Sequence, residues 1–379
     1  MKVLIVITKS EIGGAQVFVL NLARSLKNRG CSVEVAAGDG DYLFGELQKE
    51  KIPFHYLNSL KRNISVLKSF YFIYDLYRLL KVMDYDLVHL NSSNTLIGAI
   101  STFFLMKKPK TIFTFHGLSF IDKNYKTKFY IKFLAKLYFK VFLKTVDKTV
   151  FVSSINYAES IEAKIVKTGE VIINGLDEVN MHFLNKNEAR DYFSGKCKMN
   201  LDNNFLIGST GRLAYQKNYE FLIENFPAIK KRIPGVKAII IGDGPSFSKY
   251  KRQIVEMGLE KDLFLVGSIK DSYRYIKAFD VFTLPSRYEG LSISLIEAVI
   301  AEIPILASNV GGNPENVGNC DRQLFNLNDS DDYINKLLVI KDDKEYFTKY
   351  NAALKSKFSL EYMVDSYQKL YEMLIAQKS

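Results

Sequence analysis

Short apolar runs rich in β-branched residues alternate with helical periodicity along the chain, and this alternation constrains the fold more than any other feature. The strand-like runs form two series, 2–8, 31–38, 86–92, 110–117 and 148–154, then 205–213, 236–245, 263–269, 281–286 and 303–309. Strands that alternate with helices assemble into parallel sheets with helices on both faces. The sequence therefore predicts an α/β fold with two Rossmann-like, doubly wound domains that bind ligands at the carboxyl ends of their strands.

The seam between the two series lies at residues 171–183, where Asn-Gly and Asp interrupt the periodicity. A chain of 379 residues also exceeds the size at which one hydrophobic core usually keeps growing. We therefore expect one domain at residues 1–175, a second at 176–358, and an amphipathic helix within 359–379.

The net charge of +11 is unevenly distributed between the halves of the chain. Residues 1–180 contain 25 Lys and Arg against 16 Asp and Glu, whereas residues 181–379 contain 27 against 25. The first domain is therefore expected to face an anionic partner.

The cysteines, histidines and Asp-x-Asp motifs of the sequence do not have the spacing of a metal site. Cys31, Cys197 and Cys320 are odd in number and widely spaced, which disfavours a zinc site or a disulfide framework and suits a reducing cytoplasm. The Asp-x-Asp motifs at 39–41 and 84–86 are expected in connections, so no metal is predicted there. Three histidines lack a partner at ligand spacing and are expected to be structural: His55, His89 and His182.

Glycine turns and cations follow several of the predicted strands. The turns at 13–16 and 242–245 let the backbone approach a ligand at a helix start, although a strand-to-helix turn needs glycine in any case. Arg212 and Lys217 follow the first strand of the second series, where two cations could neutralise a diphosphate. A solvated helix start is the alternative.

Two glutamates, Glu289 and Glu297, flank a glycine and the start of an apolar helix. Taken by itself, the pair is what two charged residues on the protein surface would look like. The alternative is that both carboxylates bind one polar ligand whose phosphate occupies the helix start between them.

Seven motifs in order, from about residue 10 to 317, together resemble the retaining glycosyltransferases of GT-B architecture, glycosyl transferases group 1, family 4 type. They are GGAQVFVLNLA, FTFHG, INGLD, TGRLAYQKN, IGDGP, LPSRYEGLSISLIEA and ASNVGGNPENV. The resemblance implies two domains facing a central cleft, with the C-terminal helix packed back on the first. The chain departs from the family at Asn218, where glycine is frequent, and at Asn313, where a hydrophobic residue is frequent.

The resemblance implies a role for each residue of the glutamate motif. Glu297 would bind the ribose hydroxyls of a nucleotide, and Glu289 would lie beside the transferred sugar. The backbone amides of Gly290, Leu291 and Ser292 would contact the phosphate.

The other motifs complete the implied site. Arg212 and Lys217 would hold the diphosphate leaving group, with Ile269 at the base. The last two roles belong to the first domain, where Gly14 would close over the phosphates and His116 would contact the sugar. Gly242 of the IGDGP motif is also expected at the nucleotide-sugar.

The implied reaction transfers a hexose or N-acetylhexosamine from a nucleotide diphosphate sugar to a lipid-linked or polysaccharide acceptor, in bacterial capsule or lipopolysaccharide synthesis. No protein nucleophile, cofactor or metal is expected, since two cations already stabilise the diphosphate. Uridine, guanosine and adenosine donors remain open. Two alternatives share the fold: a sugar-nucleotide epimerase or hydrolase, and a non-catalytic binding subunit.

A basic segment of the first domain, 123–148, carries lysines at a four-residue step with aromatic residues between them. A helix there would present one lysine stripe to anionic lipid headgroups, on the inner face of the plasma membrane. The alternative is a solvated Rossmann helix, and nucleic acid is not expected because no nucleic-acid motif accompanies the charge. The predicted membrane-facing residues are Lys128, Lys132, Lys136, Lys140 and Lys144.

Overall fold

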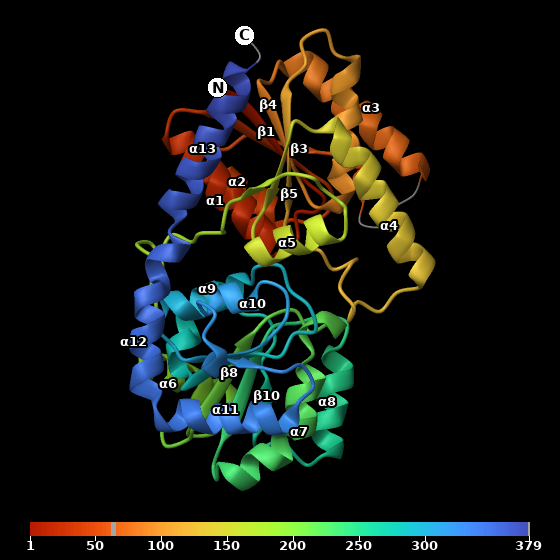
Figure 1. The fold of residues 1–379 in the computed structure, drawn as a ribbon. Helices are drawn as coiled ribbons and strands as arrows, with labels where there is room; N and C mark the ends of the chain where they lie inside the picture. Colours follow the sequence, from red (N-terminus) through yellow and green to blue (C-terminus); the bar gives the residue numbers. More distant parts are fainter. Residues whose placement is uncertain (62–65, 378–379) are drawn as a thin grey trace. The chain divides into compact units, whose positions relative to one another are not determined.

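The computed structural model describes residues 1–61 and 66–377, which form two compact units (Figure 1). The first unit comprises Met1–Ile121, Lys126–Gly175 and the C-terminal segment from Ser359. The second comprises Leu176–Phe358 and the short segment Asp122–Tyr125. Each unit contains its own parallel sheet.

The sheet of the first unit has the order β3-β2-β1-β4-β5-β6-β7, and all its strands are parallel. Its central strand β1 is buried on both faces, which explains its continuous apolar sequence. The strands are β1 Lys2–Ile7, β2 Ser32–Ala37, β3 Phe54–Tyr56, β4 Leu87–Asn91, β5 Lys110–Phe115, β6 Lys148–Phe151 and β7 Glu170–Val171.

Alternate residues of β1 enter different cores, one on each face of this sheet. Val3 and Ile5 join a core with α1 Gly14–Asn28, α2 Tyr42–Lys49 and the C-terminal helix α13 Leu360–Ala376. Leu4 and Val6 join the core on the other face, because successive side chains of a strand point to opposite sides. The helices of that face are α3 Val66–Met83, the 3₁₀ segment η1 Ser93–Phe104 and α4 Phe129–Phe142.

The second unit repeats the design with a parallel sheet of order β10-β9-β8-β11-β12-β13. The strands are β8 Leu206–Thr210, β9 Lys237–Ile241, β10 Leu263–Leu265, β11 Val281–Leu284, β12 Ile305–Ser308 and β13 Leu324–Phe325. The longer helices are α6 Lys186–Cys197, α7 Tyr219–Arg232, α8 Phe247–Glu256, α9 Ile293–Ile300, α11 Ser330–Asp342 and α12 Lys344–Leu354. The α/β prediction of two doubly wound domains is confirmed.

The chain passes from the first unit to the second after Gly175 and returns at Ser359. The Leu176 amide donates to the carbonyl oxygen of Phe358 at 3.0 Å, so the two connections are hydrogen-bonded. A Cβ on Gly175 would lie 2.2 Å from the Ser359 carbonyl oxygen, which requires glycine for so close a passage. The Ser359 side chain caps α13 by accepting from the Tyr362 amide.

The predicted helix over 123–148 is shorter than expected. Asp122–Tyr125 groups with the second unit, α4 begins only at Phe129, and Lys148 starts strand β6, where it pairs with Glu170. Sequence alone also missed β3, β7 and β13, because edge strands of two or three residues carry too little pattern. Among the described helices, none combines the length and apolar character needed to cross a membrane.

Candidate active site

The loops that follow β8 and β11 meet at the carboxyl edge of the second sheet. These two strands are parallel neighbours, so both loops leave at the same edge. The Arg287 amide donates to the Gln216 carbonyl oxygen at 2.7 Å, and Arg287 Nη1 donates to the Tyr215 carbonyl oxygen at 2.7 Å. The two loops therefore form one hydrogen-bonded surface.

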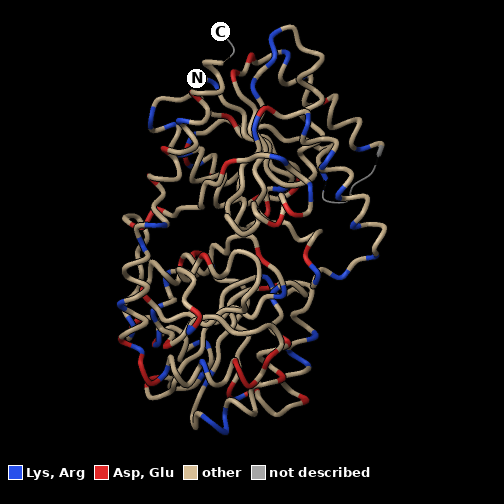
Figure 2. The backbone as a smooth tube through the Cα atoms, viewed as in Figure 1, with Lys and Arg blue, Asp and Glu red and all other residues tan. Residues whose placement is uncertain are grey.

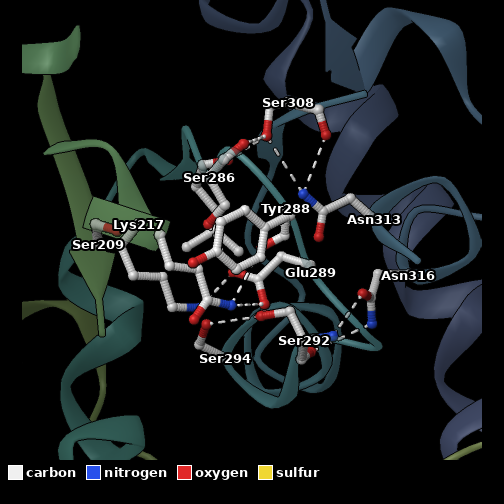
Figure 3. Close-up of polar contacts among 12 residues, drawn as sticks. Ser209, Lys217, Ser286, Tyr288, Glu289, Ser292, Ser294, Ser308, Asn313 and Asn316 are labelled. Atoms are coloured by element: carbon white, nitrogen blue, oxygen red, sulfur yellow. Dashed lines mark hydrogen bonds and ion pairs between the residues drawn. The ribbon is translucent and has the colours of Figure 1, made fainter. Parts of the chain in front are cut away.

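An ion pair lies at the centre of this surface (Figure 3). Lys217 Nζ is 2.6 Å from Glu289 Oε1, and the two side chains are only 16% and 7% exposed. Ser286 Oγ donates to the same carboxylate oxygen at 2.6 Å, and Gln216 Nε2 donates to Oε2 at 3.3 Å. The resemblance implies different parts of a ligand for Lys217 and Glu289, whereas in the structure they bind each other.

Lys217 is held in place by the geometry of the turn before α7. Asn218, which follows it, has φ 55° and is almost completely buried. This left-handed conformation favours glycine or asparagine, which explains why Asn218 can replace the family's frequent glycine. The aliphatic chain of Lys217 passes beside Gly211, where a Cβ would lie 3.3 Å from Lys217 Cε.

Arg212 follows Gly211 in the chain and is exposed. Within the described part of the chain it makes no hydrogen bond or ion pair, so its guanidinium is available to a ligand. Its loop lies on the turn after β9: a Cβ on Gly242, at φ 146°, would be 2.0 Å from the Gly211 carbonyl oxygen. Gly242 thus permits close contact between two backbone segments, which is the structural reason for glycine in that motif.

The start of α9 offers fewer free amides than the sequence predicts. The Ser292 amide donates to Asn316 Oδ1 at 3.1 Å, so a phosphate would have to displace that side chain to reach the amide. That side chain comes from a distant loop, which the local sequence does not reveal. The amides of Gly290 and Leu291 have no acceptor among the described residues.

Glu297 lies in α9, and its carboxyl group has neither a hydrogen bond nor an ion pair within the described ranges. Protein atoms crowd its carboxyl group, and this desolvation raises its pKa to about 8. A carboxyl group without a cation beside it is suited to neutral donors such as sugar hydroxyls. Ile269 follows β10 and is partly exposed, with no polar role of its own.

Gly311 and Asn313, which sequence reasoning did not assign to the site, lie in the turn after β12 that supports the Glu289 loop. A Cβ on Gly311, at φ 48°, would lie 2.1 Å from the Glu289 carbonyl oxygen. Asn313 is fully buried and donates to the Ser308 carbonyl oxygen at 3.0 Å. Asn313 therefore holds the β12 turn, so its departure from the family's frequent hydrophobic residue is structural rather than minor.

The segment Asp122–Tyr125 also reaches these loops. Asn124 Nδ2 donates to the Arg287 carbonyl oxygen at 3.1 Å, and its own carbonyl oxygen accepts from the Tyr215 hydroxyl at 3.3 Å. The Tyr125 ring meets that of Tyr288 edge-on at 5.5 Å. The sequence, which assigns this segment to a helix, contains no signal for these contacts.

Two predicted residues of the first unit lie at the carboxyl edge of its own sheet. Gly14 is the exposed first residue of α1, after strand β1. His116 directly follows β5, and its Nε2 lies 2.9 Å from Asn91 Oδ1. Burial lowers the pKa of His116 to about 4, so the ring is neutral at pH 7. Because the amide oxygen is an acceptor, the proton lies on Nε2 and Nδ1 can accept a hydrogen bond.

His89 and His55 have structural contacts instead. His89 is buried between the Tyr371 hydroxyl and Thr114 Oγ1, at 2.6 and 2.7 Å, and burial lowers its pKa to about 3. His55 Nε2 lies 2.6 Å from Glu34 Oε2. Over the described ranges no three His, Cys, Asp or Glu side chains gather as a metal would require.

Two doubly wound parallel sheets with these loops define a GT-B glycosyltransferase. The sequence family described as Glycosyl transferases group 1 matches residues 197–356, and the one described as Glycosyltransferase Family 4 matches residues 12–179. An Escherichia coli UDP-Gal:alpha-D-GlcNAc-diphosphoundecaprenol alpha-1,3-galactosyltransferase is 32% identical over 80% of this chain and 77% of its own length. The chain therefore belongs to the group 1 glycosyltransferases.

Other similar proteins agree with this membership. The Staphylococcus aureus capsular polysaccharide biosynthesis glycosyltransferase CapH is 27% identical over 83% of both chains. Among solved structures, Anabaena Alr3699/HepE in complex with UDP and glucose has a TM-score of 0.80 at 18% identity, covering 98% of this chain and all of that one. At that identity the likeness shows the fold alone.

Proposed function

We propose that this protein is a retaining, metal-independent glycosyltransferase that transfers a hexose or N-acetylhexosamine from a UDP-sugar to a saccharide carried on a lipid diphosphate, in bacterial cell-surface glycan synthesis. The observation that carries the proposal is the Lys217–Glu289 pair between the carboxyl ends of β8 and β11, with the exposed Arg212 beside it. The similarity to a galactosyltransferase whose name specifies UDP-Gal and a diphosphoundecaprenol acceptor supports the choice of donor and acceptor.

The proposed reaction breaks the bond between the sugar C1 and the diphosphate oxygen, which leaves with the electron pair. Arg212 and Lys217 stabilise the negative charge that develops on this oxygen, and the free Gly290 and Leu291 amides add two further donors. Each such donor is typically worth about 3 kcal/mol of transition-state stabilisation. These groups together supply the charge that a divalent ion would otherwise supply.

Transfer with retention requires the acceptor hydroxyl to approach C1 from the face that the diphosphate leaves. The hydroxyl oxygen bonds to C1, and its proton passes to the departing diphosphate oxygen. Glu289 stabilises the positive charge on the sugar ring. Its hydrogen bonds from Ser286 and Gln216 hold the carboxylate in place when Lys217 turns to the diphosphate. His116 Nδ1 accepts from a hydroxyl of the sugar.

We further propose that the enzyme works in the cytoplasm at the inner face of the plasma membrane, since a lipid-linked acceptor is confined to the bilayer. The basic excess of residues 1–180 supports an anionic surface as the partner of the first unit. Nucleic acid is not proposed.

Release of UDP from UDP-galactose, UDP-glucose and UDP-N-acetylglucosamine, with and without a lipid diphosphate saccharide and with and without EDTA, tests the proposal. Acceptor-dependent release that survives EDTA, with an α-linked product by NMR, is expected. Equal release without acceptor would indicate a hydrolase, and loss of release in EDTA would exclude metal independence. Arg252→Ala, an exposed arginine on α8, is the matched control for Arg212→Ala.

A further inference from the structure

Helix α4 presents apolar side chains to the solvent as well as lysines. Its outward positions recur at three- and four-residue steps, as on one face of a helix. Phe129 is 85% exposed, Phe133 58% and Leu134 57%. Of the predicted lysines, Lys132 and Lys136 are partly exposed, while Lys128, Lys140 and Lys144 are exposed. Further exposed apolar residues of α4 are Tyr130, Ile131, Leu137 and Val141.

Helix α3 has a second apolar face of the same kind. Phe70 is 66% exposed and Tyr71 64%, and the end of η1 adds Phe104 at 66%. The Phe104 ring meets the Tyr77 ring of α3 edge-on at 6.4 Å, so these residues are neighbours. The remaining large exposed apolar side chains of this part are Leu67, Tyr74, Val82, Phe103 and Met106.

Both helices present these faces away from the same side of the first sheet. Side chains of α3, η1 and α4 enter one core on that side. Ser101 Oγ of η1 donates to the Ile73 carbonyl oxygen of α3 at 2.9 Å, and the Tyr138 hydroxyl of α4 donates to the Ser93 carbonyl oxygen of η1 at 3.0 Å. Because both helices pack inward on η1, their outward faces together form one surface, which we call the α3–α4 surface (Figure 1).

The charge around this surface is predominantly positive. Between residues 123 and 146 the chain contains seven lysines and no acidic residue, so the tube of α4 carries blue segments and no red ones in Figure 2. Helix α3 adds the exposed Lys68, Arg78 and Lys81, while its one acid, Asp75, accepts from Ser59 Oγ at 2.5 Å. The lysines of the first group are Lys123, Lys126, Lys128, Lys132, Lys136, Lys140 and Lys144.

We propose that the α3–α4 surface docks on a bilayer of anionic phospholipid, with the exposed aromatic and aliphatic side chains inserted among the lipids and the lysines at the headgroup phosphates. An apolar face flanked by lysines is the arrangement that binds a helix in the interfacial plane. At 14 residues α4 is about 21 Å long, enough to lie along the surface. The inference rests on the proposed lipid-linked acceptor and deepens it by naming the surface that brings the enzyme to it.

The same face could instead bury itself against a second copy of the chain. Lysine excess on both copies opposes that arrangement, because a two-fold interface places like patches against each other. An anionic bilayer is complementary in both charge and hydrophobicity, and it is the occupant to which the proposal commits.

Co-sedimentation of the full chain with phosphatidylglycerol–phosphatidylcholine vesicles tests the proposal. Phe129→Gln, Phe133→Gln and Leu137→Gln together remove apolar side chains and keep helix propensity, since glutamine is a good helix former. The matched control is Val255→Gln, Val339→Gln and Met373→Gln, three exposed apolar helix residues outside the surface. We expect the first variant to bind the vesicles about tenfold more weakly or worse and the control to bind normally.

A charge-reversal variant distinguishes binding to the anionic headgroups from non-specific hydrophobic adsorption. Lys128→Glu, Lys136→Glu and Lys140→Glu are expected to lower binding to anionic vesicles by about tenfold or more, whereas Lys231→Glu, Lys251→Glu and Lys261→Glu are not. The proposal would be overturned if the wild-type protein did not bind phosphatidylglycerol vesicles. It would also be overturned if the Phe129/Phe133/Leu137 variant still sedimented with them. So would a dimer that this variant dissociates without any vesicle binding.

UDP release with a short-chain acceptor analogue distinguishes this inference from the proposed function. The α3–α4 variants are expected to keep that release, which also shows that they fold. Vesicle binding without any UDP release would contradict the proposed function and support the α3–α4 surface as a docking site. UDP release without vesicle binding would do the reverse.

Discussion

Lys217 Nζ lies 2.6 Å from Glu289 Oε1, although 72 residues separate them in the chain. The contact forms because β8 and β11 are parallel neighbours, whose following loops meet at one edge of the sheet. The cation proposed for the diphosphate thus neutralises the carboxylate proposed for the sugar. Binding of the donor would replace that contact with a diphosphate.

Arg212→Ala is the cleanest test of the diphosphate role. Arg212 is exposed, and across the described residues it has no polar partner, so the free energy of unfolding is expected to change by less than about 0.5 kcal/mol. Turnover is expected to fall about 100-fold or more, because a charged donor to the leaving oxygen is lost. Urea unfolding and UDP release measure the two quantities, and normal turnover in a folded variant would contradict the role.

Lys217→Ala is expected to lower both turnover and stability. It removes a transition-state donor and leaves the largely buried Glu289 without its cation, at a cost of about 1–3 kcal/mol. Adding Glu289→Gln removes the unpaired charge, so the double variant should regain stability while staying inactive. A double-mutant cycle by urea unfolding measures this coupling, and strictly additive losses would show that the pair does not interact.

Glu297→Gln should stabilise the protein in a pH-dependent way. The pKa of the Glu297 carboxyl is about 8 in the folded chain against an ordinary 4.5, so the native state holds a proton that the unfolded state releases between these values. Wild-type stability therefore falls as pH rises from about 5 to 8, while the glutamine variant lacks this loss. The difference in melting temperature should be small at pH 5 and largest above pH 8.

The control for that series is Glu178→Gln, which changes an exposed carboxylate. An advantage of Glu297→Gln that stays constant across the pH range would mean that another group causes it. The same variant should weaken UDP binding by about tenfold or more, because it replaces a ligand acceptor.

Asn218 tests the backbone of the Lys217 turn. At φ 55°, Asn218→Gly should be neutral, whereas Asn218→Val should cost about 1–2 kcal/mol or more, since a β-branched residue is strained in the left-handed region. The urea midpoint of unfolding measures both. Equal midpoints for the two variants would show that the turn adopts another conformation.

Asn91→Asp tests the protonation of His116. Burial keeps the wild-type ring neutral at pH 7, with its Nε2 proton donated to Asn91 Oδ1. A carboxylate at that position would favour the imidazolium and raise the pKa of His116 by about 1–3. An NMR pH titration of the ring, assigned with His116→Gln, measures the change. An unchanged titration would exclude the Asn91–His116 contact in solution.

The sequence by itself determined the two doubly wound domains and their buried strands. Apolar runs such as that of β1 depend on neighbours two to four residues away, and such local periodicity survives without tertiary information. The positions of Arg212, Lys217 and Glu289 after strand ends, and of Glu297 in the helix that follows, came from the same pattern and from a family resemblance.

Only the tertiary structure decided which of these groups meet. The Lys217–Glu289 pair, the capture of the Ser292 amide by Asn316 and the outward apolar face of α4 all depend on segments distant in the chain. Lysine spacing alone suggested a lysine stripe facing outward, and packing of α4 on η1 leaves apolar residues facing outward beside the exposed Lys128 and Lys140. Periodicity defines the faces of a helix, but the neighbour that buries one face is set by the fold.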